Sequence, residues 1–337
     1  METPTESPQK SRRGRILAYV LLGLLGLLLI LLLTVFAAVQ YSLDKLNRPD
    51  PSETYISEED LLLEQAGEEP LGDFPAMDPG ELELPEAGGL IGQEDDILNV
   101  LLIGQDRRPG EGRARSDAMI LCSVNKTDGT IYLISFLRDL YVAIPEGYSD
   151  NRLNAAYALG GFRLLDAALE QNFGIRVDAN IEVDFSGFES AVDLLGGVDV
   201  SLTEAEADYL GLWPGMNHMD GAQALAYSRI RYLDSDFGRT NRQRNVLTAM
   251  IAQLRNVDLA SAKALVDELF PLVTTDMTNM QILDYMTWLL PMLSSAEVRA
   301  LHIPADETYY YATIRGMSVL VPDLEANQAL LLEALGQ

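Results

Sequence analysis

The sequence has 337 residues, 48% of them hydrophobic, and its 51 acidic and 24 basic residues give a net charge of −27. A surface this acidic repels nucleic-acid phosphates, which argues against a DNA- or RNA-binding protein. One cysteine and two histidines exclude a disulfide framework and most metal sites built from cysteine or histidine.

The first predicted element is a transmembrane helix over residues 16–39, a stretch of 24 residues without a charge. Such a helix would be about 36 Å long, enough to cross a hydrocarbon core of about 30 Å. Four basic residues lie within residues 10–15. The positive-inside rule therefore predicts a cytoplasmic tail over residues 1–15 and places everything after Tyr41 outside the cell. The alternative is a cleaved signal peptide, whose apolar region is normally shorter than this one.

Residues 40–95 are predicted to form an extracellular spacer. Residues 50–96 carry sixteen acidic residues and no basic one, and prolines recur throughout the spacer. Because such a segment offers little apolar surface to bury, we expect it to be solvated and mobile. Only Leu61–Leu63 indicates a short helical turn within it.

Residues 96–337 are predicted to fold as one extracellular domain. Short apolar runs predict strands, and apolar residues at helical spacing predict helices. The Asp128-Gly129 pair predicts a hairpin between two of the strands. The predicted strands are residues 97–103, 118–124, 130–136, 181–185, 198–201, 301–303 and 317–321. The predicted helices are residues 162–172, 187–195, 222–229, 242–254, 262–273, 280–293 and 325–335. This order favours a three-layer α/β/α sandwich with a mixed central sheet.

Arginines gather in loops that follow the predicted strands, where α/β folds commonly bind ligands. They are Arg107, Arg108, Arg113, Arg115, Arg138, Arg152, Arg229, Arg231, Arg239, Arg242 and Arg244. Arginine suits bidentate contact with phosphate or carboxylate, so the pattern indicates an anion site. The alternative is ion pairing on a solvated surface, because aspartates are interleaved with the arginines.

Two of those aspartates, Asp106 and Asp117, lie at strand ends and favour the anion site. Two carboxylates together with phosphate oxygens form a typical Mg²⁺ site, which Mn²⁺ can also occupy. No phosphate-binding loop of the Gly-x-x-x-x-Gly-Lys-Ser/Thr type is present, and the glycines of a dinucleotide fingerprint are missing after Gly104. Nucleotide chemistry is therefore disfavoured.

Eight stretches between residues 99 and 243 resemble, in order and spacing, the LytR-CpsA-Psr family of cell-wall glycopolymer transferases. They are Asn99–Arg107, Arg115–Asp117, Ser135–Asp139, Asn154–Gly161, Val183–Phe188, Leu195–Val200, Leu225–Arg231 and Asp236–Gln243. The resemblance implies a membrane-anchored phosphotransferase that moves an anionic glycopolymer, such as wall teichoic acid or a capsule-like polysaccharide, from undecaprenyl pyrophosphate to a peptidoglycan hydroxyl.

The resemblance also implies residue roles. Asp106 and Asp117 would hold Mg²⁺, and Arg138 would act in catalysis. Apart from the resemblance, Asp234 or Asp236 is our candidate for orienting or deprotonating the acceptor hydroxyl. The pyrophosphate would be bound by Arg107, Arg115, Arg138, Arg229, Arg231, Arg239, Arg242 and Gln243.

The lipid tail would need an apolar tunnel between the sheet and the helices. Phe185, Phe188, Leu194 and Leu195 are candidates for its lining, and core packing is the alternative role for them. Two other functions remain open. A pyrophosphohydrolase of the same lipid carrier would use the same residues, and a non-catalytic wall-polymer-binding or regulatory protein would not need the aspartates.

Overall fold

The computed structural model describes residues 37–50, 53–68, 72–91, 96–105, 115–231, 233–255 and 266–335. The chain divides into two compact units, Met1–Lys45 and Leu46–Gln337. In the first unit, residues 37–43 are helical. No helix within the described ranges is long and apolar enough to cross a membrane. The predicted tail and all but the last three residues of the predicted transmembrane helix lie outside the described residues.

The second unit is built on a six-stranded mixed sheet in the order β10-β3-β2-β1-β6-β9. Its strands are β1 (Ile97–Gln105), β2 (Ser116–Asn125), β3 (Thr130–Phe136), β6 (Ala179–Asp184), β9 (Val273–Thr275) and β10 (Glu297–Ile303). β1 runs antiparallel to β2 and parallel to β6, and β3 runs antiparallel to β2 and parallel to β10. The prediction of a mixed central sheet is therefore confirmed.

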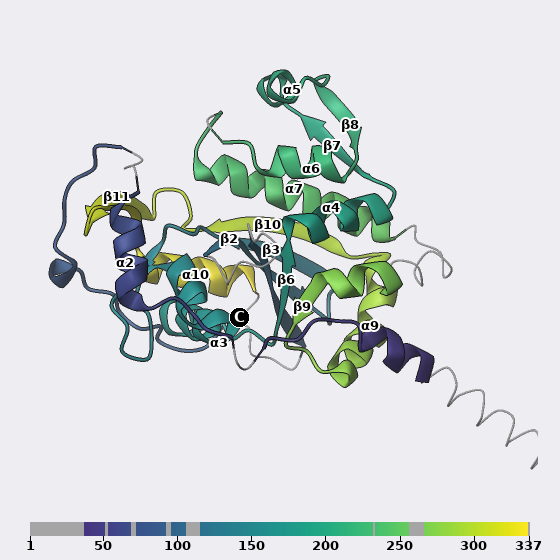
Figure 1. The fold of residues 1–337 in the computed structure, drawn as a ribbon, viewed down its shortest axis with the longest axis horizontal. Helices are drawn as coiled ribbons and strands as arrows, with labels where there is room; N and C mark the ends of the chain where they lie inside the picture. The colour runs from purple at the N-terminus through teal and green to yellow at the C-terminus, as the bar shows by residue number, and fades with distance from the viewer. Residues whose placement is uncertain are drawn as a thin grey trace, which may run out of the picture. The chain divides into compact units, whose positions relative to one another are not determined.

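Helices cover both faces of this sheet (Figure 1). On one face, Leu101 and Ile103 of β1 belong to the core formed with α3 (Leu153–Phe173) and α10 (Leu324–Ala334). On the other, Val100 and Leu102 pack into the core formed with α7 (Asp236–Leu254) and α9 (Asn279–Leu293). Successive side chains of a strand point to opposite faces, so the continuous apolar run of β1 serves both layers. The three layers are as predicted.

The hairpin between β2 and β3 forms where Asp128-Gly129 predicts it. Gly129 has a φ of +77°, a backbone conformation that residues with a Cβ rarely adopt. The Asp128 carboxylate accepts a hydrogen bond from the backbone N–H of Thr130 at 2.8 Å. The local sequence thus fixes the antiparallel pairing of the two strands.

Two further helices, α4 (Phe185–Leu194) and α6 (Gly221–Ser228), lie beside α7 (Figure 1). The backbones of α4 and α6 approach each other closely at Gly221. A Cβ placed on Gly221 would lie 2.2 Å from the carbonyl oxygen of Glu189. The predicted strand 198–201 is β7 (Val198–Leu202). It pairs with β8 (Gly215–Met219) in a separate two-stranded sheet beside α5 (Glu204–Leu210), and not with the central sheet.

The C-terminal hairpin forms another small sheet from β11 (Tyr309–Ile314) and β12 (Met317–Pro322). A third pair, β4 (Tyr141–Val142) and β5 (Asn151–Arg152), lies between β3 and α3 in the sequence. The predicted helix 262–273 is wrong at its end, because η2 (Phe270–Leu272) is a 3₁₀ turn and Val273 begins β9. The first four residues of that prediction lie outside the described residues.

The interpretation of residues 40–95 as a solvated spacer is wrong for much of the described part. Residues 46–91 belong to the same compact unit as the sheet, so the unit begins well before the predicted residue 96. The segment contains α2 (Glu58–Ala66) and the 3₁₀ turn η1 (Pro79–Glu81). Leu61 is 0% exposed within the main core, and Ile91 is buried there as well. Only a few apolar residues anchor the segment, which explains why its composition resembles that of a free spacer.

Candidate functional site

Four strands of the central sheet end at one edge, namely β1, β3, β6 and β10, and β2 begins there. The register pairs Gln105 with Ser116, the chain neighbours of the two aspartates predicted to hold a metal. Arg138 and Asp139 follow the end of β3. The sheet therefore brings separate polar stretches of the sequence to a common edge, as expected for a ligand site in an α/β fold.

Arg138 is the centre of a cluster of charges at this edge. Its Nη1 donates to Asp117 Oδ1 at 2.9 Å, and its Nε lies 3.5 Å from carboxylate oxygens of both Asp139 and Asp236. Burial alone would lower the pKa of Arg138, but the three carboxylates outweigh it and raise that pKa above its ordinary value. Arg138 is therefore a permanent cation held in place by carboxylates from three parts of the chain.

Arg239, near the start of α7, is 4% exposed and joins the cluster through its Nη2, which donates to Asp236 at 3.1 Å. Its Nε and Nη1 are buried and have no hydrogen-bond partner in the described part of the chain. Burial and the nearby charges of Arg138 and Arg231 lower the pKa of Arg239. Unsatisfied buried donors beside other cations are costly, and a bound anion would satisfy them.

Gln243 lies one helical turn after Arg239, and its buried Oε1 likewise has no partner among the described residues. Residues four apart lie on the same face of a helix. Arg239 and Gln243 are therefore placed to act on one ligand.

Arg242 and Asp234 are held differently. Arg242 is 2% exposed and donates to Glu206 at 2.7 Å, to Asp234 at 2.5 Å and to the carbonyl of Ile230 at 3.2 Å. These bonds engage Nε and both terminal nitrogens of the guanidinium. The structure therefore gives Arg242 a structural role and ties Asp234 to it, whereas Asp236 contacts Arg138 and Arg239.

Arg115 and Arg152 are paired with carboxylates from α2 and the residues just after it. Arg115 contacts Glu64 at 3.0 Å and also Glu68, and Arg152 contacts Glu68 at 2.5 Å. Arg152 also donates to the carbonyl of Ser318 through Nε and Nη2. The predicted pyrophosphate ligand Arg115 therefore already has anionic partners within the chain.

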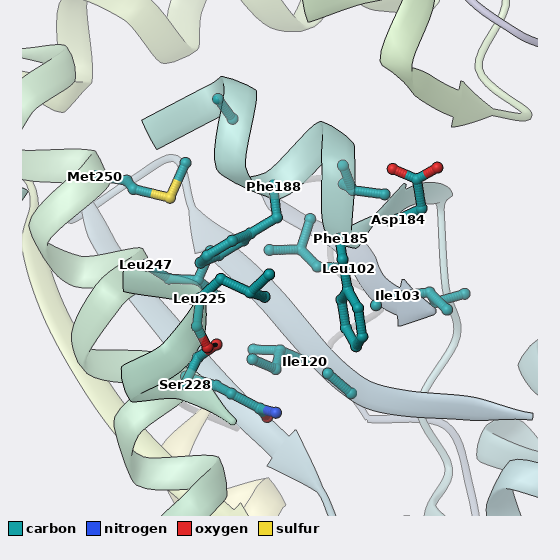
Figure 2. A pocket seen from close by; sticks show the side chains of 15 residues that line it. Leu102, Ile103, Ile120, Asp184, Phe185, Phe188, Leu225, Ser228, Leu247 and Met250 are labelled. Carbon is teal, nitrogen blue, oxygen red and sulfur yellow. Dashed lines mark hydrogen bonds between the residues drawn. The ribbon is translucent and has the colours of Figure 1, made fainter. Parts of the chain in front are cut away.

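An apolar pocket lies between the sheet and the helices α4, α6 and α7 (Figure 2). Its volume, with the open mouth included, is about 830 Å³. Figure 2 shows Phe185 and Phe188 pointing from α4 toward the strands. Both residues line the pocket, as predicted for an apolar tunnel. Leu194 and Leu195, the other two candidates, are not among its lining residues. Leu102 and Ile120 line it from the sheet, and Leu225, Leu247 and Met250 from the helices.

A cation borders the pocket at Phe185. The guanidinium of Arg229 lies over the Phe185 ring, 4.2 Å from its centroid. Ser228, which precedes Arg229, lines the pocket, as does Gln243, one turn from Arg239. Arg231, two residues after Arg229 in the sequence, is exposed to solvent. The apolar pocket is therefore bordered by the cation of Arg229, an arrangement that suits a ligand with an apolar chain and an anionic head.

Asp106 and Arg107 lie outside the described residues, so of the two predicted metal ligands only Asp117 is placed. No group of three or more histidine, cysteine, aspartate or glutamate side chains within the described residues could hold a metal ion. Asp117 is a carboxylate beside an anion site. This fits Mg²⁺, which proteins usually bind through one or two carboxylates together with substrate phosphates.

Sequence reasoning missed the part played by Asp139. Its side chain is buried and lies against Arg138, Arg152 and Asp236. Burial raises the pKa of Asp139 and the neighbouring Asp236 raises it further, against the opposing effect of the two arginines. Its position directly after Arg138 was the available signal. Glu64 and Glu68 carried no signal, because they lie in a run of acidic residues.

Comparison with known proteins shows which family the chain belongs to. The sequence matches the LytR_cpsA_psr family over residues 73–331. It is 32% identical over 228 residues to the polyisoprenyl-teichoic acid–peptidoglycan teichoic acid transferase TagU of Bacillus cereus, covering 65% of this chain and 74% of that protein. It is also 32% identical over 270 residues to TagT of Bacillus subtilis, with 76% of each chain covered.

Another relative carries a different kind of name. The regulatory protein MsrR of Staphylococcus aureus is 32% identical over 169 residues, which cover 49% of this chain and 51% of MsrR. Among solved structures, TagT bound to LIIa-WTA superposes with a TM-score of 0.60 at 27% identity, covering 80% of this chain and 98% of that one. The extent of these matches shows that the chain belongs to the LytR_cpsA_psr family.

Proposed function

We propose that this chain is a membrane-anchored phosphotransferase that moves an anionic glycopolymer from undecaprenyl pyrophosphate to a peptidoglycan hydroxyl. The observation that carries the proposal is the junction at Phe185, whose ring lines an apolar pocket and lies under the guanidinium of Arg229. The names of TagU and TagT, as teichoic acid transferases acting on peptidoglycan, support the same reaction class. The polymer would be a wall teichoic acid or a capsule-like polysaccharide.

The two halves of the junction suit the two halves of such a donor. The polyprenyl tail would occupy the pocket between Phe188, Leu225 and Met250. The diphosphate would satisfy the free donors of Arg239 and lie against Arg138 and Arg229. Charge-assisted bonds from guanidinium groups are strong and directional, so they would fix the phosphorus atoms in position.

The reaction itself needs positioning and charge neutralisation more than covalent catalysis. The acceptor hydroxyl oxygen would form a bond to the phosphorus that carries the sugar. The bond from that phosphorus to the bridging oxygen would break, and undecaprenyl phosphate would leave. Asp236, on the site side of α7, is the carboxylate we assign to orient the hydroxyl and accept its proton.

Mg²⁺ belongs to the proposal as a cofactor, with Mn²⁺ as a substitute. Asp117, and Asp106 by its place in the sequence, would hold the ion. When bound, it would neutralise charge on the diphosphate. We further propose that residues 16–39 anchor the chain, with the N-terminus in the cytoplasm and the catalytic domain outside. The partners would then be membrane lipid, the lipid-linked polymer and peptidoglycan.

Two other functions compete with this one. Water in place of the sugar hydroxyl would make the chain a pyrophosphohydrolase, since the same residues bind the donor. The similarity to MsrR, which is named as a regulatory protein, favours a non-catalytic regulatory or polymer-binding role.

The deciding experiment incubates the purified full chain in detergent with a polyprenyl-pyrophosphate-linked saccharide, peptidoglycan fragments and Mg²⁺. Products are followed by mass spectrometry, with Arg138→Ala and Asp117→Ala alongside. A saccharide joined to peptidoglycan by a phosphodiester, and absent with both variants, is the expected result. Free saccharide phosphate regardless of acceptor would favour the hydrolase. Retained lipid binding without any turnover would favour the binding protein.

A further inference from the structure

Helix α2 is held firmly against the domain, although four of its nine residues are acidic. Leu61 is fully buried in the main core. Gln65 is also fully buried, and its amide exchanges two hydrogen bonds with the Asn151 amide, at 3.1 and 3.2 Å. Glu58 accepts a hydrogen bond from the backbone N–H of Ser149 at 2.8 Å. These contacts fix the direction in which the later carboxylates of the segment point.

Two of those carboxylates, Glu64 and Glu68, face Arg115, a predicted pyrophosphate ligand, and its neighbour Arg152. Glu68 bridges two guanidinium groups, with one oxygen on Arg115 and the other on Arg152. Glu64 adds a second contact to Arg115 at 3.0 Å. A carboxylate that bridges two arginines occupies donor positions that a phosphoryl group would use in the same way.

These pairs continue into the charged cluster around Arg138. Arg152 Nε lies 3.5 Å from Asp139, and Asp139 lies 3.5 Å from Arg138. Positive and negative groups thus alternate without a break from Glu68 to the proposed diphosphate site. Arg152 keeps two further bonds to the carbonyl of Ser318, so it stays in place if Glu68 leaves.

We propose that Glu68, assisted by Glu64, is an internal anion that competes with the donor's diphosphate for Arg115 and Arg152. The inference rests on the diphosphate-binding part of the proposed function. The arginines are open to a ligand only for the fraction of time that these carboxylates are away, and the apparent affinity for the diphosphate falls by that fraction. The same carboxylates return once the diphosphate has been cleaved, which favours release of the lipid product.

Glu68 is suited to this role because it keeps its charge. Burial would raise the pKa of Glu68, but the hydrogen bonds and charges of Arg152 and Arg115 outweigh burial and hold that pKa below its ordinary value. The competitor is therefore ionised throughout the neutral range.

The test measures binding of inorganic pyrophosphate to the full chain in detergent by titration calorimetry, so it does not depend on turnover. Glu68→Gln preserves the shape of the side chain and removes its charge. We expect it to tighten pyrophosphate binding roughly tenfold, the factor for arginines that are open about one tenth of the time. Glu64→Gln should tighten binding less, because Glu64 touches only Arg115 and its side chain is 55% exposed.

Glu59→Gln is the matched control, since it removes the same charge from an exposed position of α2. It should leave the affinity unchanged, which separates local competition from the effect of net charge. If Glu68→Gln bound pyrophosphate with the same affinity as the wild type, or more weakly, the inference would be overturned. The carboxylates would then serve only to hold α2 against the domain. If Glu68→Gln does not fold, Glu64→Gln decides in the same way.

The outcome also separates this inference from the proposed function. Tighter pyrophosphate binding by Glu68→Gln in a chain that transfers no polymer would support the competitor and reject the transferase. Transfer by the wild-type chain with an unchanged affinity in Glu68→Gln would reject only the competitor. No pyrophosphate binding by any form would reject both.

Discussion

The guanidinium of Arg229 lies over the ring of Phe185, with its central carbon 4.2 Å from the ring centroid. A cation over an aromatic face is attracted by the negative charge of that face. Phe185 also lines the apolar pocket, so its side chain contacts both the pocket and the guanidinium of Arg229. The contact fixes the guanidinium at the point where a lipid diphosphate would change from apolar to charged.

Phe185→Leu removes the ring and keeps an apolar side chain. Because Arg229 is exposed, the lost contact is worth about 0.5–1 kcal/mol, so we expect the KM for the lipid-linked donor to rise by roughly 2- to 5-fold. The KM for the acceptor should not change. Tyr132→Leu is the control, because Tyr132 stacks with Arg299 outside the pocket. A donor KM that responds equally to both substitutions would contradict the assignment.

Asp236→Asn tests which aspartate acts on the acceptor hydroxyl. A positioned general base contributes about 10²- to 10⁴-fold to a rate, and we expect kcat to fall within that range. Asp234→Asn should cost much less in kcat, because Asp234 is bound to the structural Arg242. Turnover of the same donor and acceptor by both variants measures the difference. Equal losses, or a greater loss for Asp234→Asn, would reverse the assignment.

Leu61→Ala tests whether the acidic N-terminal segment is part of the fold. Leu61 is 0% exposed, and truncating a fully buried leucine costs about 2–5 kcal/mol in the free energy of unfolding. Leu63 lies in the same helix and is 68% exposed, so Leu63→Ala should change that free energy by about 0.5 kcal/mol or less. Denaturant unfolding of both variants gives the comparison. Similar small values would mean that the segment does not pack on the domain in solution.

Asp166 makes stability depend on pH. Burial is the main cause that raises the pKa of Asp166 to about 7, and the nearby charge of Asp276 also raises it. A hydrogen bond donated by Asn180 acts in the opposite direction and lowers the pKa. Between the ordinary pKa and about 7 the folded chain holds a proton that the unfolded chain has lost. The free energy of unfolding therefore falls as the pH rises through this interval and levels off above it.

Asp166→Asn should remove this dependence. At pH 8 we expect the variant to be more stable by on the order of 2 kcal/mol, and below pH 4 we expect no advantage. Thermal unfolding across the pH range measures the effect. Asp306→Asn, at an exposed position, is the control and should follow the wild type. A variant that is less stable at pH 8 would show that the Asp166 charge contributes to the fold.

Removal of divalent cations tests the metal assignment. A chelator should abolish transfer, and Mg²⁺ or Mn²⁺ should restore it. Asp117→Asn should raise the Mg²⁺ concentration needed for half-maximal activity by at least roughly tenfold, the lower limit found when even the surroundings of a metal ligand are changed. Full activity in the presence of chelator would exclude the metal from the reaction.

Local patterns predicted most elements of the central layers, although not β9, whose first residue lies in a predicted helix. β3 begins and ends where its apolar run does, and α9 differs from its prediction by one residue. Their signals are local, because periodicity and turn residues act over a few neighbours. The pairing of β7 with β8 depends on contacts distant in sequence, so the pattern predicted a strand without indicating its sheet.

The structure brings together two of the predicted site residues, Arg138 and Arg239, which both contact Asp236. Their roles stay predictions. The sequence could not indicate that Arg242 is satisfied by Glu206, or that Arg115 is satisfied by Glu64 and Glu68. Which carboxylate reaches which arginine is decided by tertiary packing, and acidic residues are abundant everywhere in this chain.

The contact at Gly221 limits how the pocket can vary. Because no atom can be added between Gly221 and the main chain of Glu189, the spacing of α4 and α6 is set by backbone alone. The distance between these two helices therefore does not depend on side-chain size at this contact. The width of the pocket depends instead on the side chains of Phe188, Leu225 and Met250. Single substitutions of the lining residues can therefore widen or narrow this pocket for a thicker or thinner lipid. The helices that enclose the pocket need not move.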